Sequence, residues 1–234
     1  MAGAVLSGDP AAPVEAIPAA SVMLLRGEPF EVLMLRRHAR SSFVPSAWVF
    51  PGGIVERADE EASQALADGS QLATMRIAAV RETFEESGVW IGDALPEMQE
   101  RRRALLAREL AFSALTKASA PALERLILTS RWITPVGLPK RFDTWFFLAE
   151  VPAETAASPE QQETVETLWI RSQAALESHA RGEMQMVFPT LRNLEAIAAF
   201  QTAEELIASR RDAVIEPILP ILVDGRPTLK QGPR

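Results

Sequence analysis

The sequence predicts a single α/β domain, because strand-like and helix-like segments alternate along it. Four short apolar runs bounded by turn-forming residues have the length and composition of strands, at 19–25, 30–35, 141–149 and 165–170. Longer stretches with helical spacing of apolar residues lie between and after these runs. Neither an internal repeat nor a change in composition marks a second unit, so we expect one domain over 19–223.

The composition is that of an ordinary globular protein, with 47% hydrophobic and 24% charged residues in a chain of 234. A net charge of −7 argues against a nucleic-acid partner. The absence of cysteine excludes disulfide bonds, zinc–thiolate sites and cysteine nucleophiles, and it agrees with a reducing compartment. No apolar run reaches the length of a membrane span and no secretory signal pattern is present, so we expect a cytoplasmic protein with no membrane partner.

The chain is expected to begin with an arm and a β-hairpin. Residues 1–18 are rich in Ala, Pro and Gly and show little periodicity, which predicts a flexible N-terminal arm. The apolar runs 19–25 and 30–35 are separated by the turn-forming sequence RGEP at 26–29. We therefore predict two antiparallel strands joined by a tight turn.

A basic, hydroxyl-rich segment, RRHARSS over 36–42, follows this hairpin in an otherwise acidic chain. Arginine side chains suit phosphate oxygens because the guanidinium donates paired hydrogen bonds. We predict that Arg37 and Arg40 bind the phosphates of a substrate, and the alternative is a solvated loop. Trp48 and Phe50, further along, are expected to pack in the core.

Three glutamates downstream form the principal candidate site. Glu82, Glu85 and Glu86 have the spacing i, i+3, i+4, so on a helix their carboxylates share one face. Like charges at this spacing destabilise an isolated helix by about 0.2–0.5 kcal/mol each. A divalent cation would convert that repulsion into binding energy, and oxygen donors suit Mg²⁺ or Mn²⁺. The alternative is a solvated acidic helix without chemistry.

The opposite face of the same predicted helix is apolar. Ile77, Val80 and Phe84 follow the spacing of a stripe that faces a core. Gly88 stands where the end of a helix often requires a positive φ. The helix therefore has one face for the core and one for a site.

Residues 50–53 (FPGG) and 81–89 (RETFEESGV) together resemble the Nudix box, the motif of the Nudix hydrolases. The resemblance implies an α/β/α sandwich around a mixed β-sheet, here with extra helices from insertions and from the C-terminal region. It implies that the metal is held by Glu82, Glu85 and Glu86 and by the backbone carbonyl of Gly53. Arg81 would orient one of the glutamates.

The first half of the box departs from the family pattern, which places an acidic residue between the glycine and the arginine. The stretch between Gly53 and Arg81 is about 14 residues longer here than in that pattern. Counting forward from Gly53 places Asp59 at the acidic position, whereas counting back from Arg81 places Ala73 there, and both assignments stay open. The inserted segment, 54–72, is expected to form a short helix ahead of the box helix.

A second helical segment follows the box. Residues 96–117 contain good helix formers and almost no breaker, which predicts one long helix. This helix is a candidate for a substrate lid or for a contact in a homodimer, and plain scaffold is the alternative. A turn is expected at 121–125, with a strand starting at Leu126.

The sequence 132–152 resembles more narrowly a Nudix branch with a lengthened box that includes acyl-coenzyme A diphosphatases. By that resemblance Arg141 is expected to contact the substrate, while Phe142 and Trp145 are expected to line a pocket.

The coenzyme A-type signature of the family lies ahead of the box and is matched only in part. Arg37 and residues 50–53 fit it, whereas Ser42 and Ser46 stand where it expects an arginine and a glycine. Acyl-coenzyme A is therefore one candidate substrate beside nucleotide sugars, ADP-ribose and dinucleoside polyphosphates.

A general base is expected near the last predicted strand, at 165–170. Family members often carry a further carboxylate just before this strand. Glu163 is our candidate, and Glu160 and Glu166 are the alternatives.

The C-terminal part is expected to be helical, with helices over 172–180, 189–200 and 202–210. An apolar stripe on the second of these helices is expected to pack on the sheet or on a second subunit. The segment 218–223 is predicted to be extended, and 224–234 is predicted to be a frayed tail.

The function implied by the resemblance is divalent-metal-dependent hydrolysis of a phosphoanhydride in a nucleoside diphosphate linked to another group. The cations would neutralise the phosphates and lower the pKa of a water molecule that attacks phosphorus, and Glu163 would accept its proton. One alternative is a binding or regulatory module that keeps the fold without turnover. The other is a purely structural acidic helix.

Overall fold

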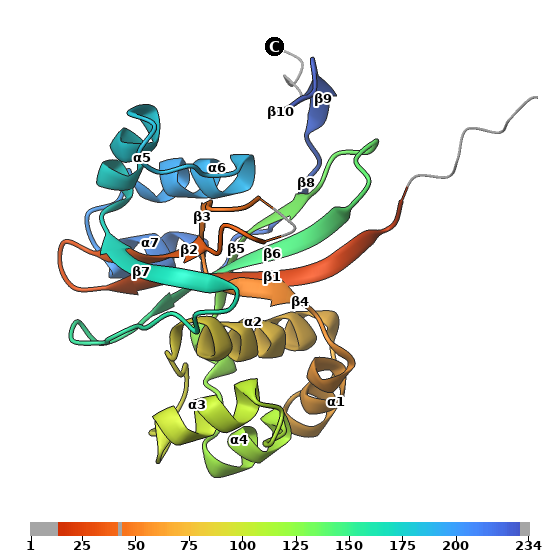
Figure 1. Ribbon diagram of the computed structural model, residues 1–234, viewed down its shortest axis with the longest axis vertical. Helices are drawn as coiled ribbons and strands as arrows, with labels where there is room; N and C mark the ends of the chain where they lie inside the picture. Colours follow the sequence, from red (N-terminus) through yellow and green to blue (C-terminus); the bar gives the residue numbers. More distant parts are fainter. Residues whose placement is uncertain (1–13, 42–43, 230–234) are drawn as a thin grey trace, which may run out of the picture.

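The computed structural model describes residues 14–41 and 44–229, which form a mixed β-sheet with helices on both faces (Figure 1). Most of the predicted N-terminal arm, residues 1–13, lies outside this range. The main sheet has the strand order β3-β2-β1-β6-β5-β8, with β4 paired to β1 and β7 paired to β2. Its strands are β1 (Ala16–Arg26), β2 (Glu31–Arg37), β3 (Trp48–Val49), β4 (Gly52–Ile54), β5 (Ile127–Ile133), β6 (Arg141–Glu150), β7 (Thr164–Ile170) and β8 (Pro217–Ile218).

The parallel pair β1 and β6 forms the centre of the sheet. Its register runs from Ala16 opposite Arg141 to Leu25 opposite Glu150. On its other side β1 pairs antiparallel with β2, so the predicted hairpin is confirmed. β1 begins at Ala16 rather than at residue 19, because the backbone of its first residues pairs with the start of β6.

Helices cover the two faces of the sheet and bury two separate cores (Figure 1). Successive residues of a strand point to opposite faces, so Phe147 of β6 packs in one core with Phe84, and Leu148 packs in the other with Leu194. The predicted α/β/α sandwich is therefore confirmed. The first face carries α1 (Arg57–Leu66), α2 (Gln71–Ser87), α3 (Met98–Leu106) and α4 (Phe112–Ala118), and the second carries α5 (Ser172–Ala180), α6 (Phe188–Ile197) and α7 (Ala203–Arg210).

Helix α2 carries the glutamates and has the two faces that its sequence predicts. Ile77, Val80 and Phe84 are fully buried against the sheet. Ser70 caps its N-terminus by accepting a hydrogen bond from the backbone of Ala73 at 3.2 Å. Gly88 ends the helix with a φ of 73°, the left-handed conformation that glycine adopts most readily.

The prediction of one long helix over 96–117 is wrong, because the chain turns between α3 and α4. Arg108 adopts a left-handed φ of 59°, and the backbone amides of Glu109 and Leu110 both donate to the carbonyl of Ala104. This turn lets Phe112 of α4 pack against Trp90, with their ring centroids 6.2 Å apart. The contact is tertiary, so helix propensity alone does not reveal the break.

The C-terminal region contains the three predicted helices and one unexpected element. Thr202 caps α7 by accepting a hydrogen bond from Glu205 at 3.2 Å. The chain then forms a small hairpin of β9 (Ile221–Val223) and β10 (Arg226–Thr228), so part of the predicted tail is ordered in a strand. No helix within the described residues is long and apolar enough to cross a membrane.

Replacing Ser70 by alanine should lower the free energy of unfolding by about 1 kcal/mol, because the N-terminal amides of α2 lose their cap. Asparagine at this position supplies an equivalent acceptor and should retain most of the stability. Urea denaturation of both variants checks this. An Asn variant as unstable as the Ala variant would show that the cap contributes nothing.

Candidate active site and metal centre

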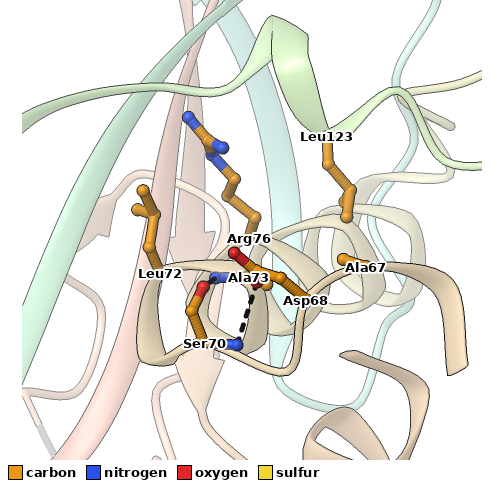
Figure 2. A pocket seen from close by; sticks show the side chains of 7 residues that line it. All are labelled: Ala67, Asp68, Ser70, Leu72, Ala73, Arg76 and Leu123. Atoms are coloured by element: carbon orange, nitrogen blue, oxygen red, sulfur yellow. Dashed lines mark hydrogen bonds between the residues drawn. The ribbon is translucent and has the colours of Figure 1, made fainter. Parts of the chain in front are cut away.

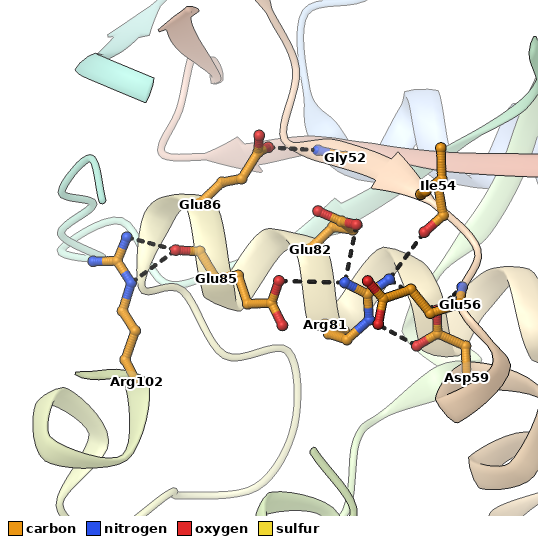
Figure 3. A network of polar contacts seen from close by, with 9 residues as sticks. All are labelled: Gly52, Ile54, Glu56, Asp59, Arg81, Glu82, Glu85, Glu86 and Arg102. Atoms are coloured by element: carbon orange, nitrogen blue, oxygen red, sulfur yellow. Dashed lines mark hydrogen bonds and ion pairs between the residues drawn. The ribbon is translucent and has the colours of Figure 1, made fainter. Parts of the chain in front are cut away.

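Arg81 lies at the centre of the site and uses all of its hydrogen-bond donors (Figure 3). Its Nε and one terminal nitrogen donate to the two carboxylate oxygens of Asp59, both at 2.8 Å. That terminal nitrogen also donates to the carbonyl of Ile54 at 2.9 Å. The other terminal nitrogen donates to Glu82 at 2.9 Å and to Glu85 at 3.3 Å. A guanidinium has five N–H groups, and each of them has an acceptor here.

Asp59 is the acidic partner of Arg81. The spacing of the sequence left two positions open for this partner, Asp59 and Ala73. Asp59 lies on α1 with no exposed surface, and the Arg81 side chain is 4% exposed. Burial opposes the charge of Arg81, but hydrogen bonds to Asp59 and the charges of Glu82 and Asp59 raise the pKa of Arg81 above its ordinary value. Ala73, the other assignment, has no carboxylate, so the count forward from Gly53 gives the partner that Arg81 uses.

The three glutamates lie on one side of α2 and differ in exposure. The side chain of Glu85 is 25% exposed and that of Glu82 is 14% exposed, whereas residue Glu86 is 5% exposed. One carboxylate oxygen of Glu86 accepts a hydrogen bond from the backbone amide of Gly52 at 2.8 Å (Figure 3). The helix therefore holds the carboxylates beside the turn that the FPGG sequence forms.

Burial makes the negative charge on these side chains unfavourable. It raises the pKa of Glu82 to about 7, and Arg81 opposes this rise only in part. Burial also raises the pKa of Glu85 and of Glu86, and the neighbouring carboxylate of Glu82 adds to the rise for Glu86. These carboxylates would gain stability from a nearby positive charge.

The residues present fit a divalent cation. A Cβ atom at Gly53 would lie 2.4 Å from a carboxylate oxygen of Glu82, so a larger residue at this position would displace that side chain. Carboxylate and carbonyl oxygens are the donors that Mg²⁺ and Mn²⁺ prefer. Within the described residues no three acidic or histidine side chains already converge as a metal-binding group. A cation would therefore have to draw these glutamates together.

The three candidates for the general base have different surroundings. The carboxylate of Glu160 accepts hydrogen bonds from the backbone amides of Gln162, Glu163 and Thr164, so it shapes a turn. Glu166 pairs with Arg36 at 3.4 Å on the surface. Glu163 lies close enough for its charge to act on Glu86. The choice of Glu163 as the general base stays a prediction.

The three predicted phosphate-binding arginines lie in different places. Arg37 ends β2, and its charge favours the ionised form of Glu86. Arg40 is exposed in the turn that follows. Arg141 is 8% exposed and donates to the backbone carbonyls of Thr134 and Val14 at 3.0 and 2.6 Å. The contact of Arg141 with substrate stays a prediction. The buried position of its side chain does not favour that contact.

Two surface hollows lie at the other end of α2. One, of about 310 Å³, is lined in part by Asp68, Ser70 and Arg76 (Figure 2). Its charged groups serve the protein itself, because Asp68 accepts from the amide of Ser70 and Arg76 donates to a backbone carbonyl. The second, of about 420 Å³, lies between α1 and α2 near Gln71. The glutamates stand roughly three turns further along the helix, so neither hollow is the active site.

Arg102 on α3 is the residue of this network that the sequence does not signal. Its guanidinium reaches the backbone carbonyl of Glu85 from a different helix (Figure 3). A helix-forming segment with several arginines gives no indication of which arginine turns inward.

Comparisons with known proteins identify similar chains. The family model described as the NUDT19 Nudix domain matches residues 61–197. A Caenorhabditis elegans protein named putative nudix hydrolase 7 is 31% identical over 86% of this chain and 66% of its own length. The protein named acyl-coenzyme A diphosphatase NUDT19 is 28% identical in Gallus gallus and 26% in Homo sapiens, each aligned over 72% of its length. The chain therefore spans about two thirds to three quarters of these relatives.

Among solved structures, a NUDIX hydrolase from Alicyclobacillus acidocaldarius superposes with a TM-score of 0.74. The two are 26% identical, and the match covers 86% of this chain and 99% of the other.

The substitution Asp59→Asn should lower the free energy of unfolding by up to about 3–5 kcal/mol, because Arg81 loses its fully buried ionic partner and keeps only the more exposed Glu82 and Glu85. Glu61→Gln, on the same helix, removes only an exposed pair with Arg57 and should change stability by less than about 1 kcal/mol. Chemical denaturation of both variants gives the comparison. Equal losses would mean that the buried pair is worth no more than the exposed one.

The metal-free protein should lose stability as the pH rises from about 4.5 to above 7. The pKa of Glu82 is about 7 in the folded protein against 4.5 in a model peptide, so the folded state binds more protons in this interval and its advantage disappears on deprotonation. The contribution of Glu82 is up to roughly 3 kcal/mol. Denaturation with a chelator at pH 5 and pH 8 should show a smaller loss for Glu82→Gln than for the wild type. Parallel losses would contradict the shift.

Proposed function

The chain belongs to the Nudix hydrolase family, and from this premise we propose that it hydrolyses a phosphoanhydride bond in a nucleoside diphosphate linked to another group, with Mg²⁺ or Mn²⁺. The observation that carries the proposal is the set of Glu82, Glu85 and Glu86 on one side of α2. Arg81 and its buried partner Asp59 hold this side of the helix against β4. A purely structural acidic helix would have no need of such an arrangement.

The glutamates and the carbonyl of Gly53 would hold the cation. When bound, a divalent cation neutralises phosphate charge and makes water more acidic. The raised pKa values of Glu82 and Glu86 support this role, because a positive charge between these carboxylates would favour their ionised forms.

The side chains of this chain would supply the remaining steps. Arg81 keeps Glu82 and Glu85 in place through its ion pairs. Arg37, whose charge favours the ionised form of Glu86, would contact a phosphate group. Glu163 would accept the proton of the attacking water as the water oxygen bonds to phosphorus and the bridging P–O bond breaks. The leaving group departs as a phosphate or a nucleoside phosphate.

Within this class of substrates we favour coenzyme A or acyl-coenzyme A. Two of the curated relatives described above carry the name acyl-coenzyme A diphosphatase. The chain has Ser46 where the coenzyme A-type signature expects glycine, yet Ser46 adopts a φ of 60°. That left-handed conformation is the one glycine adopts without strain, so the backbone at Ser46 suits the glycine that the signature expects.

Phosphate release, coupled to a phosphatase, should be measured over nucleotide sugars, ADP-ribose, dinucleoside polyphosphates, coenzyme A and acyl-coenzyme A with each metal. Glu86→Gln should lower turnover by orders of magnitude, because it removes a buried ligand. Glu163→Gln should lower kcat by about 10²-fold or more. The matched control, Glu166→Gln, alters only a surface pair and should leave kcat unchanged.

Two results would contradict the proposal. Negligible turnover across the panel with both metals would favour the binding or regulatory module. A Glu166→Gln variant as impaired as Glu163→Gln would remove Glu163 from its role as the base.

A further inference from the structure

We propose that Arg102 is a positioning residue that fastens the loop carrying Glu163 to the C-terminal turn of the glutamate helix α2. The proposal rests on the proposed function, because it concerns the group that would take the proton from water. Arg102 belongs to α3, an element of the segment between the box and β5. Through Arg102, the segment between the box and β5 would help to position the group that takes the proton from water.

The contacts of Arg102 join two elements that are distant in sequence. Its Nε and one terminal nitrogen donate to the backbone carbonyl of Glu85 at 3.0 and 2.8 Å (Figure 3). The terminal nitrogens also donate to the hydroxyl and the carbonyl of Ser158, at 3.0 and 2.9 Å. The residue is only 5% exposed, so these bonds form away from solvent.

The last turn of α2 shows why such a residue matters. The final carbonyls of a helix have no partner within the helix. Here the amide of Gly88 donates to the carbonyl of Phe84, Arg102 donates to that of Glu85, the hydroxyl of Thr164 donates to that of Glu86, and the amide of Ser158 donates to that of Ser87. Three of these four carbonyls therefore have a partner from another element, and Arg102 also binds one of these partners, Ser158.

The loop continues from Ser158 to the candidate base through a second set of contacts. The carboxylate of Glu160 accepts hydrogen bonds from the backbone amides of the turn that contains Glu163. The carbonyl of Glu163 accepts from the amide of His38 at 2.7 Å. The loop is thus held at Ser158 by Arg102 and by the carbonyl of Ser87, and near Glu163 by the end of β2 and by the bond from Thr164 to the carbonyl of Glu86. If Arg102 is lost, Ser158 keeps, of these contacts, the amide hydrogen bond to Ser87, so the start of the loop that leads to Glu163 is held less firmly.

The planar guanidinium suits this role better than an ammonium group does. Three different N–H directions reach Glu85 and Ser158 at once, and a lysine has a single nitrogen at its end. The positive charge also lies at the C-terminus of a helix, where cations are favoured. Arg102→Lys should therefore restore part of the effect of Arg102→Gln.

Hydrogen exchange tests the attachment without any substrate. In Arg102→Gln, amides of the segment 155–164 should exchange at least about tenfold faster than in the wild type, because the loop opens locally. Amides in the middle of α2 should keep their protection. The control Arg103→Gln changes the adjacent, exposed arginine and should leave the loop unchanged. Unaltered exchange in Arg102→Gln would overturn the proposal.

A double-mutant cycle tests the consequence for catalysis. Arg102→Gln should lower kcat by about 10–100-fold, as a small misplacement of a reacting group does, with KM within about threefold. In the Glu163→Gln background the same change should lower kcat by less than about threefold, because its effect is exerted through Glu163. A change that only destabilised the fold would lower kcat equally in both backgrounds.

The outcomes separate this proposal from the proposed function. Equal losses in both backgrounds would overturn the action of Arg102 through Glu163, while the hydrolase activity would stand. An inactive wild type would contradict the proposed function, and hydrogen exchange would then decide alone whether Arg102 fastens the loop.

Discussion

The buried contact between Asp59 and Arg81 is the interaction on which the site depends. It joins α1 to α2, and through the carbonyl of Ile54 it joins both helices to β4. Burying two charges has a large desolvation cost, which is offset only when the geometry is good and every donor is satisfied. The saturated hydrogen bonding of Arg81 meets that condition. Two of its donors also reach Glu82 and Glu85, so one side chain supports the fold and orients the candidate site.

Whereas the contact between Asp59 and Arg81 stabilises the fold, the buried glutamates destabilise it. Glu86 is almost fully buried, and its neighbour Glu82 is nearly as enclosed, so their ionised forms are unfavourable in the absence of a cation. Folded proteins have only a small net free energy of unfolding, so such a destabilisation must be offset elsewhere in the structure. The apolar face of α2, with Ile77 and Phe84 fully buried, supplies the offsetting stability. The same helix therefore combines a stabilising face with a destabilising one, which is the usual relation between a core and a functional site.

Local sequence patterns predicted much of the fold, but they did not predict contacts between residues that are distant in the sequence. The stripe of α2, its glycine end and the β1–β2 hairpin follow from the spacing of a few residues. The break at Arg108 does not, because it goes with a tertiary contact, the packing of Phe112 against Trp90. The inward position of Arg102 and the burial of Arg141 depend on carbonyls of Glu85 and of Val14, which only the folded chain brings within reach. The common side of the three glutamates on α2 follows from helical spacing, whereas Asp59 was left open because its partner Arg81 lies on another helix.

The central position of β1 has a consequence for the order in which the chain can fold. β1 is the first strand, yet its parallel partner β6 begins only at Arg141. β7, the partner of β2, begins at Thr164, immediately after the candidate base. Such distant pairings raise the contact order and slow folding, since a long loop must close before they form. On a ribosome, the helices of the first face would emerge while the sheet they cover is still incomplete, so the site would be assembled late, after most of the polypeptide has been synthesised.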